Sequence, residues 1–156
     1  MLQARFRSLG VAWLVLCVVL ALHVFDEATT GFLGVYNPTV LALRQQLGWW
    51  PMPTFTFDAW LQGLIVGCIL LLALSVPIFY GARWLYIPAA IFAALTLLNA
   101  AGHIVFTMLG HTVATVRFPR PAPGFWSSPF LAAASIYFLI QLRKTREPKL
   151  SASTSA

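Results

Sequence analysis

The chain has 156 residues, of which 60% are hydrophobic and 9% are charged, and its formal net charge is +6. Its mean hydropathy of +0.81 excludes an ordinary water-soluble domain, because the surface of such a domain needs many more polar residues. A basic protein can bind nucleic acid, but here the charges lie at the ends of apolar runs, so we expect no nucleic-acid partner. The composition is typical of an integral membrane protein.

Apolar runs along the chain predict the membrane-spanning helices, each of which needs about 20 residues. Three runs are clear, at residues 9–25, 59–79 and 85–109. A fourth, at residues 130–142, reaches spanning length only if residues 126–129 form its first turn. The first run is longer than the apolar core of a signal peptide and no small-residue cleavage site follows it, so we expect it to be retained. The predicted fold is therefore all-α, a bundle of four transmembrane helices.

The positions of the basic residues predict the orientation of the chain. If the helices alternate in direction, Arg44, Arg117 and Arg120 lie at one membrane face and the seven other Lys and Arg residues lie at the opposite face. Cytoplasmic loops carry the excess of Lys and Arg, so we expect both termini in the cytoplasm and a multi-pass protein of the cell (inner) membrane. Residues 1–149 then form one membrane domain, and residues 150–156 have the composition of a disordered tail.

The two long connections are expected to lie at the outer face and to carry structure of their own. Residues 28–58 are too many for a simple turn, and the apolar stripe within residues 40–47 predicts a short interfacial helix, with Asn37 as N-cap and Pro38 as first helical residue. Residues 110–129 are rich in proline and glycine and are expected to form an ordered cap. The turn between the second and third spans is short, which predicts that these helices are antiparallel neighbours.

Ionisable side chains near the outer ends of two spans form the candidate site, because such groups are costly in a membrane and usually functional. His23, Asp26 and Glu27 are three and four residues apart in the first span and project from one side of a helix. His103 lies at a matching depth in the third span, which crosses in the same direction, and Asn99 precedes it by one turn. We expect the two histidines to face each other, with Asn99 holding the imidazole or lining a cavity.

Two histidines and a carboxylate are a common ligand set for a divalent metal such as zinc. His23, Glu27 and His103 are therefore the candidate metal ligands, and Asp26 and Glu27 the candidate catalytic carboxylates. This set points to a metal-dependent membrane hydrolase that acts on lipid-like substrates. For His111, just beyond the third span, an interfacial or solvated role is expected, with a supporting role in the site as the alternative.

Other functions use the same groups. They could pass protons across part of the membrane, or clamp two helices together in a non-enzymatic protein that binds a membrane lipid or a partner. Haem held by His23 and His103 is a further option, which the neighbouring carboxylates disfavour.

Several of these residues resemble the HXXEE family of small bacterial membrane proteins, whose function is unknown. The family is defined by an H-x-x-E-E motif, a further histidine and a Y-x-P-G motif. Here His23-Val-Phe-Asp26-Glu27 and Pro121-Ala-Pro-Gly stand in the same order. Asp26 replaces the first Glu and keeps the charge with a shorter reach, whereas Pro121 replaces Tyr and removes a hydroxyl. The resemblance implies that His103 or His111 is the family histidine, and the depth of His103 favours the former.

Overall fold

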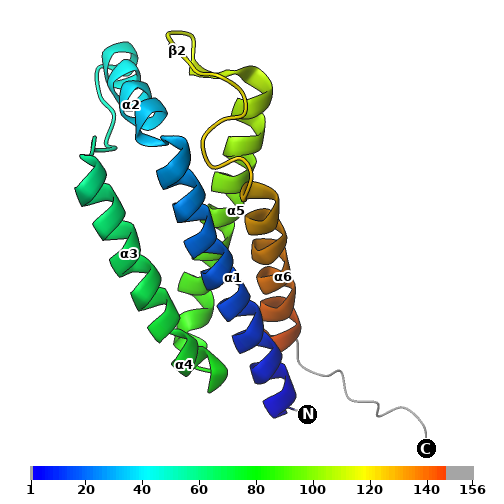
Figure 1. Cartoon of the computed structure of the whole chain (residues 1–156). Coiled ribbons are helices and arrows are strands. Elements are labelled where there is room, and N and C mark those ends of the chain that lie inside the picture. The colour runs from blue at the N-terminus through cyan, green and yellow to red at the C-terminus, as the bar shows by residue number, and fades with distance from the viewer. Residues whose placement is uncertain (1, 147–156) are drawn as a thin grey trace, which may run out of the picture.

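The computed structural model of the chain describes residues 2–146, which are mostly helical (Figure 1). The predicted tail, residues 150–156, lies outside the described residues. A short antiparallel hairpin, which the all-α prediction did not include, comes directly after the third of the long apolar helices. The elements in chain order are α1 (Leu2–Thr30), α2 (Leu33–Leu47), α3 (Phe57–Ala73), α4 (Ser75–Phe79), the 3-10 turn η1 (Arg83–Leu85), α5 (Tyr86–Leu109), β1 (His111–Val113), β2 (Val116–Arg117) and α6 (Ser128–Arg146).

Three helical stretches among residues 2–146 are long and apolar enough to cross a membrane, namely Gln3–Thr30, Phe57–Phe79 and Arg83–Leu109. They coincide with the three clear predicted spans. Helix α6 forms where the fourth span was predicted, but its last turns carry Arg143, Lys144 and Arg146 and it is not one of the three. The chain is therefore a helical protein whose apolar helices are consistent with a membrane protein.

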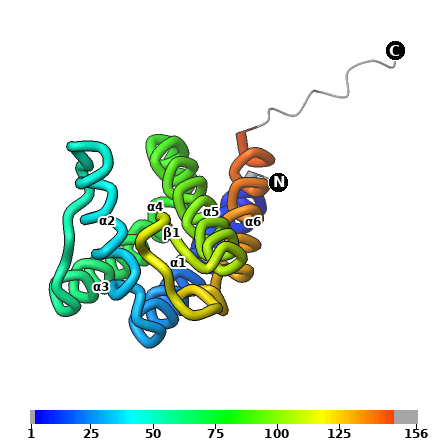
Figure 2. Tube along the Cα trace, turned by 90° about the horizontal axis from the view of Figure 1, so that it is seen from above, coloured from blue at the N-terminus to red at the C-terminus, as the bar shows by residue number. Residues whose placement is uncertain are grey.

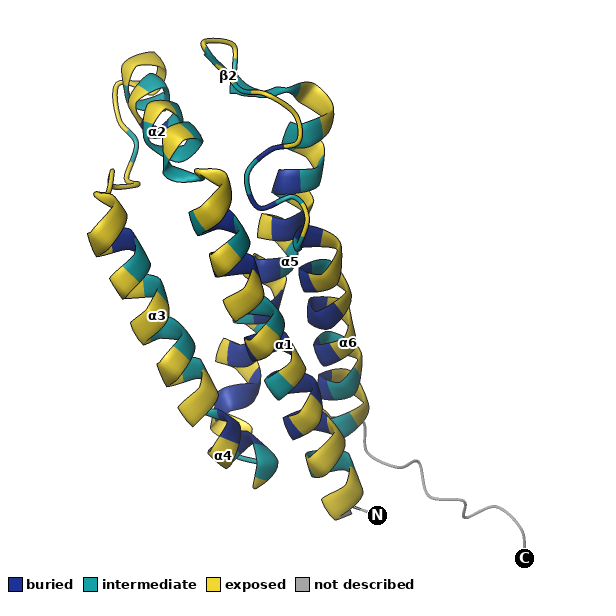
Figure 3. Cartoon of the chain, in the orientation of Figure 1, coloured by how far each residue is buried: buried dark blue, intermediate teal, exposed yellow. Residues whose placement is uncertain are grey.

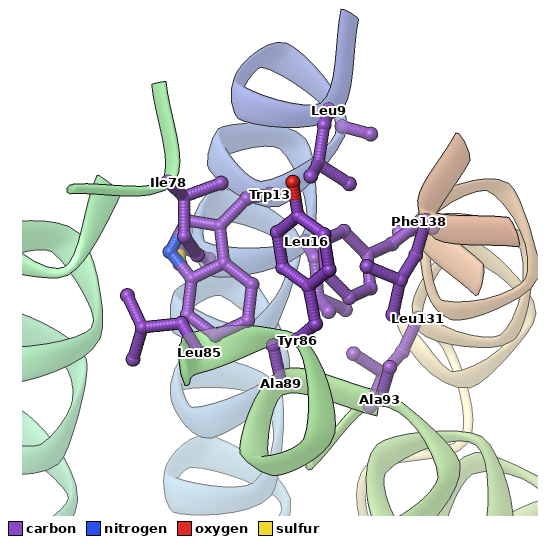
Figure 4. Close-up of a cluster of buried hydrophobic side chains, with 14 of the residues drawn as sticks. Leu9, Trp13, Leu16, Ile78, Leu85, Tyr86, Ala89, Ala93, Leu131 and Phe138 are labelled. Carbon is purple, nitrogen blue, oxygen red and sulfur yellow. The ribbon is translucent and has the colours of Figure 1, made fainter. Parts of the chain in front are cut away.

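The main core lies between α1, α5 and α6, which pack together (Figures 1 and 2). Large side chains of α1 and α6 fill it, and Trp13 meets Phe138 edge to face with ring centroids 5.3 Å apart (Figure 4). Helix α5 contributes small residues such as Ala89 and Ala93, which let helices approach closely. A hydrogen bond of 2.9 Å between Thr96 Oγ1 and a serine hydroxyl of α6 adds to this contact. The packing fixes the rotation and depth of α5 relative to α1.

Helix α3 is not the neighbour of α5 that the short turn predicted. It packs against α1, whereas α5 packs mainly against α6. Most of α3 is exposed (Figure 3), and only Trp60 among its residues is buried. The prediction was wrong because α3 is apolar on all sides, so that no polar stripe directs one face toward the other helices. Its exposed apolar side chains suit contact with lipid.

The second span is divided into α3 and α4 at Leu74. Pro77 has no N–H to donate to the carbonyl of Ala73, and the carbonyl of Leu71 accepts a hydrogen bond of 2.9 Å from Trp13 Nε1. Helix α4 packs against α1 beyond this break.

The expected interfacial helix exists as α2, but it begins earlier than predicted. Gly31 turns the chain with a φ of +78°, and α2 begins at Leu33, so Pro38 lies inside the helix and Asn37 is not its N-cap. Proline at this position forfeits only one helical hydrogen bond. The Asn37 amide instead donates to the carbonyl of Phe55 at 2.8 Å and accepts from its N–H at 3.1 Å. These bonds tie α2 to the segment that leads into α3.

Residues 118–127 form the ordered cap that their prolines and glycine predicted. This segment returns from the hairpin across the ends of α1 and α5 to the start of α6 (Figure 1). The N–H of Ala122 donates to Thr107 Oγ1 of α5 at 2.9 Å, and the N–H of Gly124 donates to Thr30 Oγ1 of α1 at 3.0 Å. The cap is therefore held by hydrogen bonds to both helices that carry the candidate histidines.

Candidate functional site

His23 and Glu27 of α1 and His103 of α5 form one buried cluster beneath the cap. Their exposed fractions are 1%, 5% and 7%. His103 Nε2 lies 3.0 Å from Glu27 Oε1, His23 Nε2 lies 3.4 Å from the same oxygen, and the two imidazole centroids are 4.9 Å apart. The predicted convergence of the three side chains is confirmed. Among residues 2–146, no other group of three or more His, Cys, Asp or Glu side chains has a spacing that could hold a metal ion.

The geometry suits a single small ion. One ligand atom from each of the three side chains lies within 4.8 Å of the other two. Two bonds of about 2 Å to a common centre span about 3.3 Å at the tetrahedral angle, close to the 3.4 and 3.0 Å that separate Glu27 Oε1 from His23 Nε2 and His103 Nε2. The helical spacing of four residues supplies His23 and Glu27 on one face of α1, and the packing of α5 supplies His103 opposite them.

A serine in the cap links His23 to the second carboxylate. The N–H and the Oγ–H of Ser127 both donate to Asp26 Oδ2, at 2.8 and 2.7 Å. Ser127 Oγ also lies 2.8 Å from His23 Nδ1. Because the hydroxyl has one hydrogen and the carboxylate receives it, His23 Nδ1 must carry the hydrogen of the second bond. This network assigns the His23 tautomer, and the neutral ring then has its lone pair on Nε2.

This tautomer leaves two acceptors facing each other inside the cluster. The lone pair of His23 Nε2 and the carboxylate oxygen of Glu27 are 3.4 Å apart, and neither can donate to the other. His103 can donate from Nε2 to Glu27 across 3.0 Å. A buried carboxylate beside an acceptor is costly unless a positive centre lies near it. A proton or cation between His23 and Glu27 would satisfy both acceptors, in competition with the Asn99 amide, which lies 2.9 Å from His23 Nε2.

Asn99 holds an imidazole, but that of His23 and not of His103, its neighbour on α5. Its amide nitrogen donates to His23 Nε2 at 2.9 Å. The same side chain lines a cavity of about 760 Å³ that also reaches His103. The cavity-lining role predicted for Asn99 is therefore confirmed, whereas the imidazole that it holds is that of His23 and not that of the neighbouring His103.

Gly124 of the cap closes the cluster. A Cβ at this position would lie 2.9 Å from Glu27 Cγ and 2.9 Å from His103 Cε1, and the residue has a φ of +78°. Any residue with a Cβ is therefore disfavoured here, both by these close approaches and by the left-handed backbone conformation. The ring of Phe32 lies with its centroid 5.8 Å from that of His103 and covers another side. The cluster is thereby shielded from bulk water.

His111 is not part of the cluster. It lies in β1, beyond the end of α5, and is half-buried. Its Nδ1 is buried and has no hydrogen-bond partner among the described residues. The structure brings it into no contact with His23, Glu27 or His103 that would give it a supporting role there.

Ser127 is the site residue that the sequence did not indicate. It lies 101 positions from Asp26, and a serine in the turn before a helix is most simply interpreted as a capping residue. Gly124 carried a recognisable signal, since a glycine after a proline predicts a tight turn. Its place above Glu27 and His103 follows from the tertiary structure alone.

No protein-family model, curated protein or solved structure matches this chain. The class of protein is therefore described from the fold and the site alone. The chain is a helical protein with apolar helices long enough to cross a membrane and a buried His, Glu, His cluster.

Proposed function

We propose that this chain is an integral membrane zinc protein that hydrolyses lipid-like substrates, with His23, Glu27 and His103 as the metal ligands. One observation carries the proposal: three ligand atoms of the right kinds converge in a buried cluster in which two acceptors face each other. Zinc sites with two histidines and one carboxylate leave a fourth position open for water, which is the arrangement of hydrolytic zinc. The bound metal would polarise a carbonyl and lower the pKa of its water.

The other residues have defined tasks in this proposal. Ser127 and Asp26 hold the Nδ1–H of His23, as outer partners of metal-bound histidines do. Asp26 is thereby engaged with Ser127, which favours an orienting role for it over that of general base. The reaction would break the acyl C–O bond of an ester, with the hydroxyl of water going to the acyl carbon and its proton to the leaving alcohol.

Zinc binding by the purified protein tests this function, and Ser127 gives the sharpest variant. The wild-type chain in lipid nanodiscs should take up one zinc per chain and release fatty acid from an ester lipid. Ser127→Ala should bind zinc about 10–100-fold more weakly, because the partner of a ligating histidine is lost. Ser127→Thr keeps the hydroxyl and should restore binding. A chelator-competition titration and a fatty-acid assay measure both effects.

Ser128→Ala is the matched control for this test. It removes a hydroxyl from the same turn that donates to the carbonyl of Gly124 at 2.7 Å and not to the histidine. We expect its zinc affinity to equal that of the wild type. Equal weakening by Ser128→Ala and Ser127→Ala, or no zinc uptake by the wild type, would refute the proposal.

A structural clamp is the second candidate function, and the Asn99 bond favours it. The amide of Asn99 already donates to the His23 lone pair at 2.9 Å, so the cluster can join α1 and α5 without a metal once one proton is shared. The chelator-competition titration distinguishes the zinc hydrolase from the structural clamp. A clamp takes up no zinc, yet loses thermal stability when His103 is replaced.

We also propose the orientation and the family. The site-bearing ends of α1 and α5 would lie at the outer face, since Arg143, Lys144 and Arg146 lie in the last turns of α6, at its end away from the cap, and basic residues favour the cytoplasmic side. Membership of the HXXEE family is supported by Gly124, the glycine of the second motif, because its missing side chain makes room for Glu27 and His103.

Reporter fusions test the orientation together with the fourth span. Fusions after Arg83 and after Lys149 should report the cytoplasm, and a fusion after Gly48 should report the outside, since basic residues stay cytoplasmic. An outside signal after Lys149 would mean that α6 does not cross the membrane. An inside signal after Gly48 would reverse the proposed topology.

A further inference from the structure

A cavity of about 760 Å³ lies directly beside the cluster. It is formed by the face of α5 that carries Asn99, Gly102 and His103, by α2, and by the hairpin and cap. Its volume is within the range of sites that hold small organic ligands, about 300–1,000 Å³. Most of the lining is apolar, and His103 is the member of the cluster that reaches it.

The cavity opens toward the surface that lipid would cover. Three of its lining residues on α5, Leu95, Leu98 and Val105, are 59%, 69% and 48% exposed. They belong to one of the stretches long and apolar enough to cross a membrane. An opening edged by large exposed apolar side chains favours entry of a ligand from the hydrocarbon, because apolar surface in contact with water is unfavourable.

The polarity of the cavity changes along its length as that of a lipid does. Leu95 and Leu98 line the end deeper along α5, whereas Tyr36, Thr39 and Thr112 line the end at α2 and the hairpin. The hydroxyls of Thr39 and Thr112 are hydrogen-bonded to each other and join α2 to β1 there. The deeper end therefore suits apolar groups, whereas the end at α2 and the hairpin offers these hydroxyls among apolar residues such as Val35 and Val113.

The length of the cavity matches one leaflet. From Leu95 to Val105, α5 rises about 15 Å at 1.5 Å per residue. The hydrocarbon core of a bilayer is about 30 Å thick, so one leaflet contributes about the same 15 Å. With its ester near His103, an acyl chain could lie along the stretch of about 12 Å of α5 between His103 and Leu95, which is most of the depth of one leaflet.

We propose that this cavity binds one acyl chain of a phospholipid from the adjacent leaflet, and that the ester group of that lipid lies at Asn99 and His103. Binding of the chain stands on the cavity itself, whereas cleavage of that ester rests on the proposed zinc hydrolase. In that reading Asn99 has a further task. If a metal took the lone pair of His23 Nε2, the Asn99 amide would be free to donate to the ester carbonyl.

Photo-crosslinking in nanodiscs tests the binding. The probe is phosphatidylcholine with a diazirine in one acyl chain, diluted into palmitoyl-oleoyl phosphatidylcholine, and mass spectrometry locates the labelled residues. Wild-type protein should be labelled on the cavity face of α5 and on α2 well above the level found on α3, which is exposed to lipid along most of its length. Equal labelling of α5 and α3 would overturn the proposal.

Gly102→Leu fills the cavity. A Cβ at Gly102 would meet only Phe106 Cε2, at 3.7 Å, and Gly102 lines the cavity, so we expect the leucine side chain to extend into the acyl space. Labelling on α5 should fall to the level of α3. Gly63→Leu is the matched control, because a Cβ on that glycine of α3 meets nothing within 4 Å, and it should leave labelling of the cavity unchanged. Undiminished labelling in Gly102→Leu, with a wild-type melting temperature, would also refute the acyl site.

The two proposals fail separately. If the wild type is labelled in the cavity but takes up no zinc, the acyl site stands and the hydrolase does not. If zinc binds but the cavity is not labelled above α3, the metal centre stands and the acyl site does not. Zinc uptake by Gly102→Leu should match that of the wild type, because this glycine contributes no ligand.

Discussion

His103→Ala should abolish zinc binding as completely as His23→Ala. Each variant removes one of three ligands and leaves Glu27, which is 5% exposed, with fewer partners. We expect affinity to fall by more than the 10–100-fold that loss of an outer hydrogen-bond partner costs. Zinc at 100 times its dissociation constant should stabilise the wild type by about 2.7 kcal/mol, which raises the melting temperature by about 5–10 °C for a chain of this size. Neither variant should show that rise.

The experiment uses protein purified without a histidine tag and measured by competition with a chelating dye. His111→Ala is the control, because His111 lies outside the cluster, and its zinc affinity and thermal shift should equal those of the wild type. A zinc-dependent shift that survives in His103→Ala would remove His103 from the ligand set. A shift that disappears in His111→Ala would place the metal elsewhere.

Gly124→Ala should both destabilise the protein and disrupt the His23, Glu27, His103 cluster. The new Cβ would lie 2.9 Å from Glu27 Cγ and 2.9 Å from His103 Cε1, closer than carbon atoms pack. The left-handed backbone adds about 1–2 kcal/mol for any residue with a Cβ. We expect both a lower melting temperature and a loss of zinc affinity, because the ligands must move apart.

Gly31→Ala separates the two causes. Gly31 has the same φ of +78° as Gly124, but a Cβ there meets nothing within 4 Å. It should therefore show the backbone cost alone, a drop of about 2–8 °C from 1–2 kcal/mol, with zinc affinity unchanged. If Gly124→Ala behaves like Gly31→Ala in both thermal unfolding and zinc titration, the cap does not press on the cluster.

The sequence by itself determined the three apolar helices and the members of the cluster. Three apolar runs of spanning length can be recognised without a structure, because hydrophobicity over about 20 residues is a local property. The spacing of His23 and Glu27 follows from helical periodicity. His103 could be paired with them because equal distances from the ends of two helices that cross in the same direction mean equal depth. All three side chains do meet.

Only the tertiary structure decided how these elements are rotated and what completes the site. Helical periodicity fixes which residues share a face, but not which helix that face meets. The sequence therefore did not reveal that α3 lies against α1 and not against α5. The small residues of α5 and the contact of Trp13 with Phe92 of α5 help set the rotation that brings Asn99 to His23 and not to its own neighbour His103. The bond from Ser127 to Asp26 joins positions 101 residues apart, and no local pattern encodes such a contact, because it depends on where the cap crosses the ends of two packed helices.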